Sequence, residues 1–273
     1  MRTPIAFGLL VLSVGCGVDQ RAPVDPIARV DLRATLYRED VMPVGFALVD
    51  GKRYIFDEQQ GLFALDGDRV EWIVEMGQMP DPGPTAPIRP PFTDLVAYAP
   101  NVFAITALGD GYLLDTQAMT LTQHFCYVPD GDGGFPQSLD QRTDAIALDT
   151  ATNKIWAQPI TRDLAGTFVR SEISMYDAAT GFDERWLQVP ENTAATAMLA
   201  NDGRLVLGQG SRLSVFYSGR PGTTQPLEDL ARFGVKSIDG MAIDHATNTL
   251  VVVDSIADAV FDIDLAQLDN PIE

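Results

Sequence analysis

The amino-acid sequence predicts an all-β fold, a β-propeller of five blades, and three observations lead to it. The stretch "DGMAIDHATNTLVVVD", which starts at Asp239, repeats much of "DAIALDTATNKIWAQP", which starts at Asp144. Helical periodicity is almost absent, and runs of β-branched and aliphatic residues alternate with polar turns instead. The pattern recurs about every 50 residues, which is close to the length of a four-stranded propeller blade.

The pattern can be followed through five copies. They begin at Val44, Asp94, Asp144, Ala194 and Asp239, so successive starts lie 50, 50, 50 and 45 residues apart. Each copy is predicted to hold an innermost strand, a turn and two further strands, which the fifth copy spells "GMAID", "HATN", "TLVVVD" and "AVFDID". A fourth, more variable strand follows in the first four copies, as in "ERWLQVP" from Glu184.

The fifth copy ends after Leu268 without a fourth strand. The segment "ARVDLRATLYR", Ala28 to Arg38, reads as a strand ahead of the first copy and is predicted to complete the last blade. Such pairing closes the ring and removes exposed strand edges that invite aggregation. Six blades is the alternative if this strand belongs to a degenerate extra blade. A pair of stacked sheets is the other alternative, although a sandwich gives no reason for the repeated phrase.

The repeated strand, turn and strand resemble the cores of NHL, gluconolactonase-like and YVTN-type β-propeller repeats, over roughly residues 28 to 268. The resemblance implies the ring architecture and separates these families poorly, and a fold does not fix a function. Gluconolactonase-like enzymes hold a central divalent metal with acidic and Asn side chains. The resemblance therefore implies a metal-dependent hydrolase as one alternative for function.

The N-terminal residues predict export and a lipid anchor. Residues 1–15 read as a signal peptide, because Arg2 precedes an apolar run that is too short to span a bilayer. The sequence Ser13-Val14-Gly15-Cys16 resembles the lipobox of bacterial lipoproteins, in which the cysteine is lipidated and becomes the mature N-terminus. Ser13 departs from the usual Leu, and an ordinary cleavable signal peptide is the alternative.

The resemblance to bacterial lipoproteins also implies a cellular location and a division of the chain into segments. Gly17 follows the cysteine where an Asp would mark inner-membrane retention, which favours the outer membrane of the bacterial cell envelope. Residues 16–27 are predicted to be the lipidated cysteine and a polar tether, and residues 28–273 a single propeller domain. If Cys16 carries lipid, Cys126 has no partner in the chain and is expected to be a small buried side chain.

Composition narrows the classes of partner. The 273 residues are 46% hydrophobic and 21% charged, as in a folded globular protein. The formal charge is −19, from 38 acidic and 19 basic residues, which argues against nucleic acid because binding there depends on Lys and Arg. The partners expected are a protein or polysaccharide of the cell envelope and, through the anchor, the membrane. The chain is expected to act as a monomer.

Candidate chemistry is sparse in this sequence. Nucleophilic catalysis and zinc binding both favour histidine, and the chain has only His124 and His245. His124 is predicted in the outermost strand of the second blade, and His245 in the first turn of the fifth. Neither position faces a central channel, so no catalytic residue is assigned.

Aspartates supply the one candidate metal site. Asp94, Asp144 and Asp239 occupy the same place in three blades, at the start of the innermost strand, where side chains from separate blades approach one axis. Carboxylates gathered there could hold Ca²⁺ or another divalent cation. The alternative is that each Asp caps its own turn. Val44 and Ala194 stand where the other two blades would need acids.

Two loops carry weaker signals. Residues 129–144, "PDGDGGFPQSLDQRTD", begin like an EF-hand loop, but Gly134 and Gln141 replace ligands, so a flexible Gly-rich loop is the preferred interpretation. Residues 77–92, "GQMPDPGPTAPIRPPF", read as a stiff spacer or a recognition surface. The sequence as a whole predicts a lipid-anchored, non-catalytic binding or scaffold module, with the metal-dependent hydrolase as the alternative.

Overall fold

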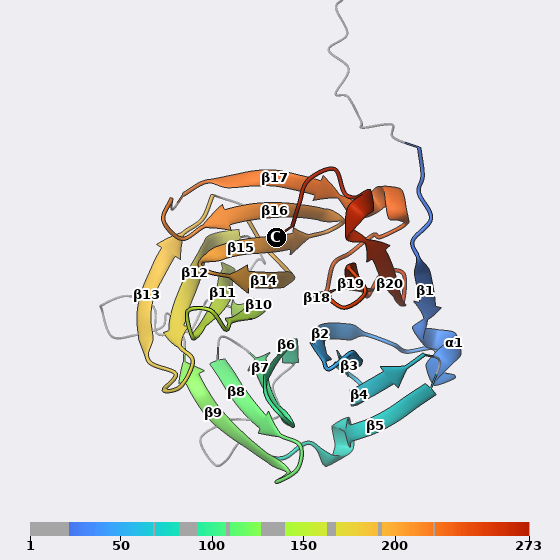
Figure 1. The fold of residues 1–273 in the computed structure, drawn as a ribbon. Coiled ribbons are helices and arrows are strands. Elements are labelled where there is room, and N and C mark those ends of the chain that lie inside the picture. The colour runs from blue at the N-terminus through green and yellow to red at the C-terminus, as the bar shows by residue number, and fades with distance from the viewer. Residues whose placement is uncertain are drawn as a thin grey trace, which may run out of the picture.

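The fold is a ring of five four-stranded antiparallel sheets, which confirms the predicted five-bladed β-propeller (Figure 1). The computed structural model describes residues 22–67, 69–81, 92–107, 110–126, 140–162, 168–190, 193–220 and 222–272. Four of the blades are meanders in which consecutive strands pair from the centre of the ring to its rim, and in the fifth the N-terminal strand takes the outermost place. Among the described residues, no helix is both long and apolar enough to cross a membrane.

The strands of each blade follow from the innermost to the outermost. Blade 1 contains β2 (Pro43–Val49), β3 (Lys52–Asp57), β4 (Gly61–Asp66) and β5 (Arg69–Glu75). Blade 2 contains β6 (Phe92–Ala99), β7 (Val102–Ala107), β8 (Asp110–Asp115) and β9 (Thr120–Cys126). Blade 3 contains β10 (Asp140–Asp149), β11 (Lys154–Arg162), β12 (Phe168–Asp177) and β13 (Asp183–Gln188). Blade 4 contains β14 (Ala197–Asn201), β15 (Arg204–Gln209), β16 (Arg212–Tyr217) and β17 (Thr224–Asp229).

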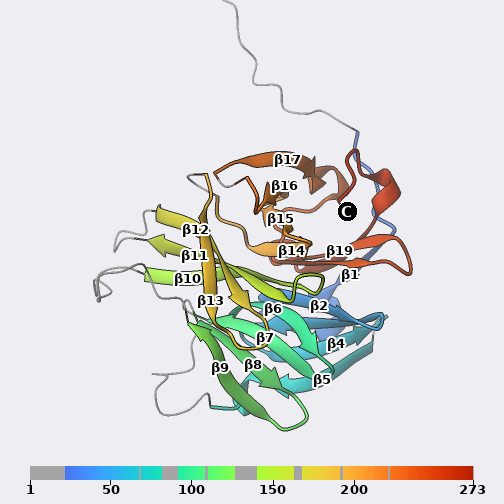
Figure 2. The ribbon, with the colours of Figure 1, turned by 60° about the vertical axis from the view of Figure 1, so that its left-hand side comes forward.

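Blade 5 joins the two ends of the described chain. It contains β18 (Gly240–Asp244), β19 (Thr249–Asp254), β20 (Ala259–Asp264) and, at its rim, β1 (Ala28–Asp31). β1 pairs antiparallel with β20, with Ala28 opposite Asp262 and Asp31 opposite Ala259. Figures 1 and 2 show this blue strand beside the red strands of the last blade. The predicted ring closure by an N-terminal strand is therefore confirmed.

The closing strand is shorter than the predicted segment from Ala28 to Arg38, because a helix replaces its second half. α1 (Leu32–Leu36) begins where the Asp31 carboxylate accepts a hydrogen bond from the Ala34 N–H at 2.9 Å, as an N-cap does. Leu32 and Leu36 lie four residues apart, on one helix face, and both are buried. The turns η1 (Met76–Gln78), η2 (Leu230–Phe233) and η3 (Leu265–Gln267) are the other helical segments described.

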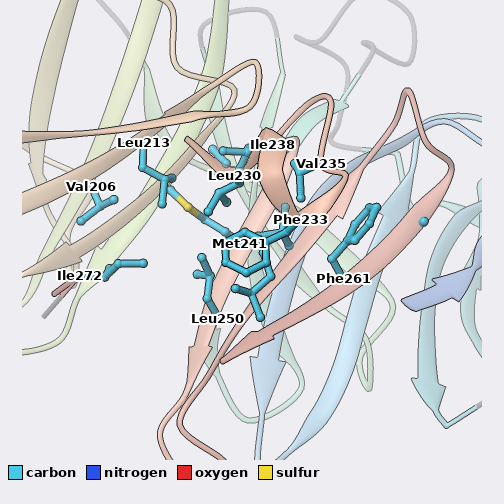
Figure 3. Packing of buried hydrophobic residues seen from close by; sticks show 14 of the residues in the cluster. Val206, Leu213, Leu230, Phe233, Val235, Ile238, Met241, Leu250, Phe261 and Ile272 are labelled. Atoms are coloured by element: carbon cyan, nitrogen blue, oxygen red, sulfur yellow. The ribbon is translucent and has the colours of Figure 1, made fainter. Parts of the chain in front are cut away.

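The hydrophobic core is divided among the five seams between neighbouring blades. The seam between blades 4 and 5, for example, buries Val206 and Leu213 against Met241 and Leu250, and Ile272 from the C-terminal segment fills it (Figure 3). Separate clusters fill the other seams in the same way. Because every blade is covered on both faces, its strands can be apolar on both faces, which explains continuous runs such as "TLVVVD".

Close packing at the axis leaves no room for a side chain at Gly45 of β2 and Gly240 of β18. A Cβ on Gly240 would lie 2.6 Å from the Phe46 Cβ and 2.8 Å from the Phe46 N. A Cβ on Gly45 would lie 2.4 Å from the Leu95 N. Neither glycine has a positive φ, so it is the space, not the backbone conformation, that excludes larger residues.

Gly240→Ala should destabilise the protein by about 1–3 kcal/mol, because the added methyl group forces β18 and β2 apart. Equilibrium urea unfolding measures this loss. Gly77→Ala is the control, since nothing lies within 4 Å of a Cβ at that position. Equal midpoints for wild type and Gly240→Ala would contradict the close-packing account.

Candidate functional site

The candidate site is the central channel that the innermost strands enclose. We call the end where β2, β6, β10, β14 and β18 begin the start face, and the opposite end the end face. A cavity of about 190 Å³ runs between these strands. Its lining is apolar except for one carboxylate, from Asp94, and one hydroxyl, from Thr150.

The channel is closed towards the start face and opens towards the end face. Phe46, Ile146 and Met241, early in their strands, are buried. Leu48 and Leu148, two residues further along, are only half-buried, and Thr150 is exposed. Aliphatic side chains therefore form the accessible wall, and the channel presents an apolar surface to whatever reaches the end face.

Asp94 lies at the closed end and is only 3% exposed. Its Oδ1 accepts a hydrogen bond from the Leu95 N–H at 2.7 Å. Its Oδ2 accepts one from the Ile146 N–H, also at 2.7 Å, across the seam between blades 2 and 3. The carboxylate therefore combines the local capping role that was the alternative for these aspartates with a link between blades.

The three predicted aspartates do gather at the start face. Burial raises the pKa of Asp94 well above its ordinary value, and the negative charges of Asp239 and Asp144 raise it further. The two N–H groups that bond to Asp94 act in the opposite direction and do not outweigh these effects. Asp144 of blade 3 and Asp239 of blade 5 therefore lie near enough to Asp94 of blade 2 for their charges to act on it.

Asp239 is half-buried and is held by its own blade. Its Oδ2 accepts a hydrogen bond from the Ser255 N–H at 2.8 Å, and its Oδ1 lies 3.1 Å from the Ser237 hydroxyl that donates to it. Burial raises its pKa, and the hydrogen bonds from Ser255 partly offset this rise. Asp144 is also half-buried.

The register identifies the residue of blade 4 that corresponds to these acids. The Thr196 N–H bonds to the Gly208 carbonyl at 2.9 Å, as the Asp239 N–H bonds to the Val253 carbonyl at 2.9 Å. Thr196, not Ala194, is therefore the equivalent position. Its hydroxyl donates to the Ile238 carbonyl at 2.6 Å and so links blades 4 and 5.

The metal site itself stays a prediction. Within the described ranges, no group of three or more His, Cys, Asp or Glu side chains is arranged to hold an ion. Asp94 and Asp239 direct both their oxygens at N–H or hydroxyl donors. An ion at this position would have to compete with those donors for the same oxygens.

The structure places the two histidines as the sequence predicts. His124 lies in β9, the outermost strand of blade 2, and its Nε2 is 2.8 Å from the Ala178 carbonyl of blade 3. The Tyr98 hydroxyl donates to the same carbonyl at 2.6 Å, so both side chains help to hold this seam. His245 is exposed in the turn between β18 and β19.

Several predictions of the sequence fall outside the described residues. Cys16, the lipidation candidate, lies there, as do residues 82–91 and 129–139, which make up most of the two predicted loop segments. The side chain of Cys126 is not described either.

Sequence reasoning missed several further hollows, and one of them is a cleft of about 530 Å³ on the end face of blade 4. Polar side chains contribute to its lining, among them Asp202, Arg204, Tyr217 and Arg220. No repeat signal identifies these residues, because they occupy turns whose lengths differ between blades. The channel lining was detectable in principle, since Ala47, Ala97, Ala147 and Ala242 recur at one register position of the innermost strands.

The raised pKa of Asp94 has a consequence for stability with a definite sign. A carboxyl whose pKa is higher in the folded than in the unfolded state favours folding most when it is protonated. The contribution of Asp94 is therefore complete below the pKa of free aspartate, about 3.9, and is lost as the pH rises through the folded value.

Asp239→Asn should lower the pKa of Asp94, because it removes one of the two charges that repel the ionised carboxylate. Carboxyl ¹³C shifts followed by NMR across the pH range measure the change. Asp244→Asn, at the other end of β18, is the matched control and should leave Asp94 unaffected. An Asp94 pKa that is the same in both variants would contradict the proximity of Asp94 and Asp239.

No protein-family model and no curated protein matches the chain. Among solved structures it is similar to a gluconolactonase from Xanthomonas campestris, at 11% identity over 82% of this chain and 72% of that one, with a TM-score of 0.47. It is also similar to BamB from Moraxella catarrhalis, at 12% identity over 83% and 86% of the two chains, with a TM-score of 0.39. Similarity at this level assigns neither a family nor an activity to this chain.

Proposed function

We propose that the protein is a non-catalytic binding module of the bacterial cell envelope, held at the outer membrane by a lipid on Cys16. Its ligand is an envelope protein or polymer that reaches the end face of the propeller. The channel there receives an apolar side chain of a protein partner.

The observation that carries this proposal is the apolar wall of an open channel. Half-buried aliphatic residues such as Leu48, Leu148 and Leu199 line it towards the end face. Burying such surface against a partner releases about 25 cal/mol for each square ångström removed from water. Concave apolar sites with a few polar groups are where proteins usually bind their ligands.

Photo-crosslinking tests the channel as a contact site. A photoreactive amino acid at Thr150, which is exposed and lines the channel, should form one reproducible adduct when the membrane-anchored protein is irradiated in whole cells. Mass spectrometry identifies the adduct. Leu48→Gln together with Leu148→Gln should reduce its yield at least tenfold, because polar side chains would face the apolar group of the partner.

The control is Ile256→Gln, a similar change at a side chain that is 61% exposed between β19 and β20, on the start face. It should leave the adduct unchanged. Equal yields from the channel variants and the control would remove the channel from the proposal.

Cys16→Ala tests the anchor separately. The variant should move from the membrane fraction to the soluble fraction, because one or more buried acyl chains supply the membrane affinity. Quantitative immunoblotting of fractionated cells measures the shift. Unchanged membrane partitioning would count against lipidation and leave the channel experiment unaffected.

The alternative function is a metal-dependent hydrolase of the gluconolactonase type. The observation that favours it is that the negative charges of Asp144 and Asp239 act on the Asp94 carboxyl at one end of the channel. Such an enzyme should gain several degrees in melting temperature from Ca²⁺ or Zn²⁺, and Asp144→Ala with Asp239→Ala should abolish the gain. A melting curve that is indifferent to metal would discard this alternative.

A further inference from the structure

We infer that the polar cleft on the end face of blade 4 binds a saccharide that carries carboxylates. The cleft has a volume of about 530 Å³, within the range of small-ligand sites in proteins. The inference rests on the proposed binding function in one respect, that the end face is the side that meets ligands. It adds a second site on this face and a chemical class of ligand.

The cleft has a local excess of positive charge in a strongly acidic chain. Arg204 and Arg220 contribute two guanidinium groups and Asp202 one carboxylate, which leaves one positive charge where the whole chain carries −19. Guanidinium groups bind carboxylates through paired, charge-assisted hydrogen bonds. This balance favours an anionic ligand over a neutral or cationic one.

Acidic side chains already neutralise some arginines of the described chain, but not these two. Ion pairs hold four of those: Arg33 with Asp258, Arg53 with Asp262, Arg212 with Asp229 and Arg232 with Glu228. Neither Arg204 nor Arg220 forms an ion pair with any described residue. Arg204 instead donates one hydrogen bond from Nη2 to the Pro271 carbonyl at 3.1 Å, which fixes its position and leaves its other N–H groups for a ligand.

The remaining lining suits a sugar ring. Tyr217 is 39% exposed and offers an aromatic face on which the C–H face of a sugar can pack. Ser218 and Gln225 add a hydroxyl and an amide, which both donate and accept hydrogen bonds as sugar hydroxyls require. An aromatic platform among such groups fits a hydroxyl-rich ring better than an extended acidic peptide.

Hydrogen bonds fix the backbone of the cleft before any ligand arrives. The Gly203 N–H bonds to the Asp149 carboxylate of blade 3 at 2.9 Å. The Ser218 N–H bonds to the Gly203 carbonyl at 3.0 Å, and the Arg220 N–H to the Tyr217 carbonyl at 2.9 Å. A preformed site loses less conformational entropy on binding.

Isothermal titration calorimetry of the purified full-length protein tests the inference with three probes of equal length. Tetragalacturonate, which has four carboxylates, should bind saturably. Cellotetraose, a neutral saccharide, should bind at least tenfold more weakly, and so should a tetraglutamate peptide. Arg220→Gln and Tyr217→Ala should each weaken tetragalacturonate binding about tenfold, through the lost ion pair and the lost ring contact.

Arg69→Gln, at an exposed arginine of blade 1, is the matched control and should leave the affinity unchanged. Both cleft variants alter exposed side chains, and melting temperatures verify that they fold. Absent binding, equal binding of the peptide, or binding that the cleft variants do not weaken would overturn the inference. Crosslinking at Thr150 does not depend on Arg220. The two experiments therefore test the channel and the cleft independently.

Discussion

The close approach of five strands to one axis is the constraint on which the rest of the structure depends. Five blades leave little room at the centre, and at the start face the backbones of β2, β6 and β18 nearly touch. Gly45 and Gly240 meet this constraint with no side chain, and Ala145 and Ala197 with a single methyl group, whereas β6 has the larger Leu95 at the same register position. The channel is closed at this end because of that contact, and it widens only where the strands diverge.

Part of the acidic character of the chain comes from its turns. Many hairpins end a strand with an aspartate whose carboxylate accepts N–H groups two and three residues further along. The residues that do this are Asp57, Asp115, Asp149, Asp177 and Asp254. Four of the five blades contain at least one such turn, so these aspartates add negative charge while holding hairpins. Any ligand must be compatible with the net charge of −19.

The repeat made the architecture predictable from the sequence. A helix cap and unequal turn lengths made some strand boundaries and alignments unpredictable. The matched phrases at Asp144 and Asp239 gave strand order and blade number, because a strand pattern repeats only if its surroundings do. The prediction that the segment after Asp31 continues as a strand was wrong, because the Asp31 carboxylate caps a helix. Ala194 was misaligned by two residues because turn lengths differ between blades. The cleft around Tyr217 carries no periodic signal at all, so only the three-dimensional structure brings its side chains together.

The two ends of the ring have different physical roles. At the start face the polar groups bond across or within blades: Asp94 reaches Ile146 and the Thr196 hydroxyl reaches Ile238. Groups that already hold blades together are costly to redirect towards a ligand, because each lost bond leaves a buried donor without a partner. At the end face the channel wall is half-exposed and the arginines of the cleft are unpaired among the described residues. A ligand can contact these exposed groups without breaking the bonds of Asp94 and Thr196, which is why we place the proposed function at the end face.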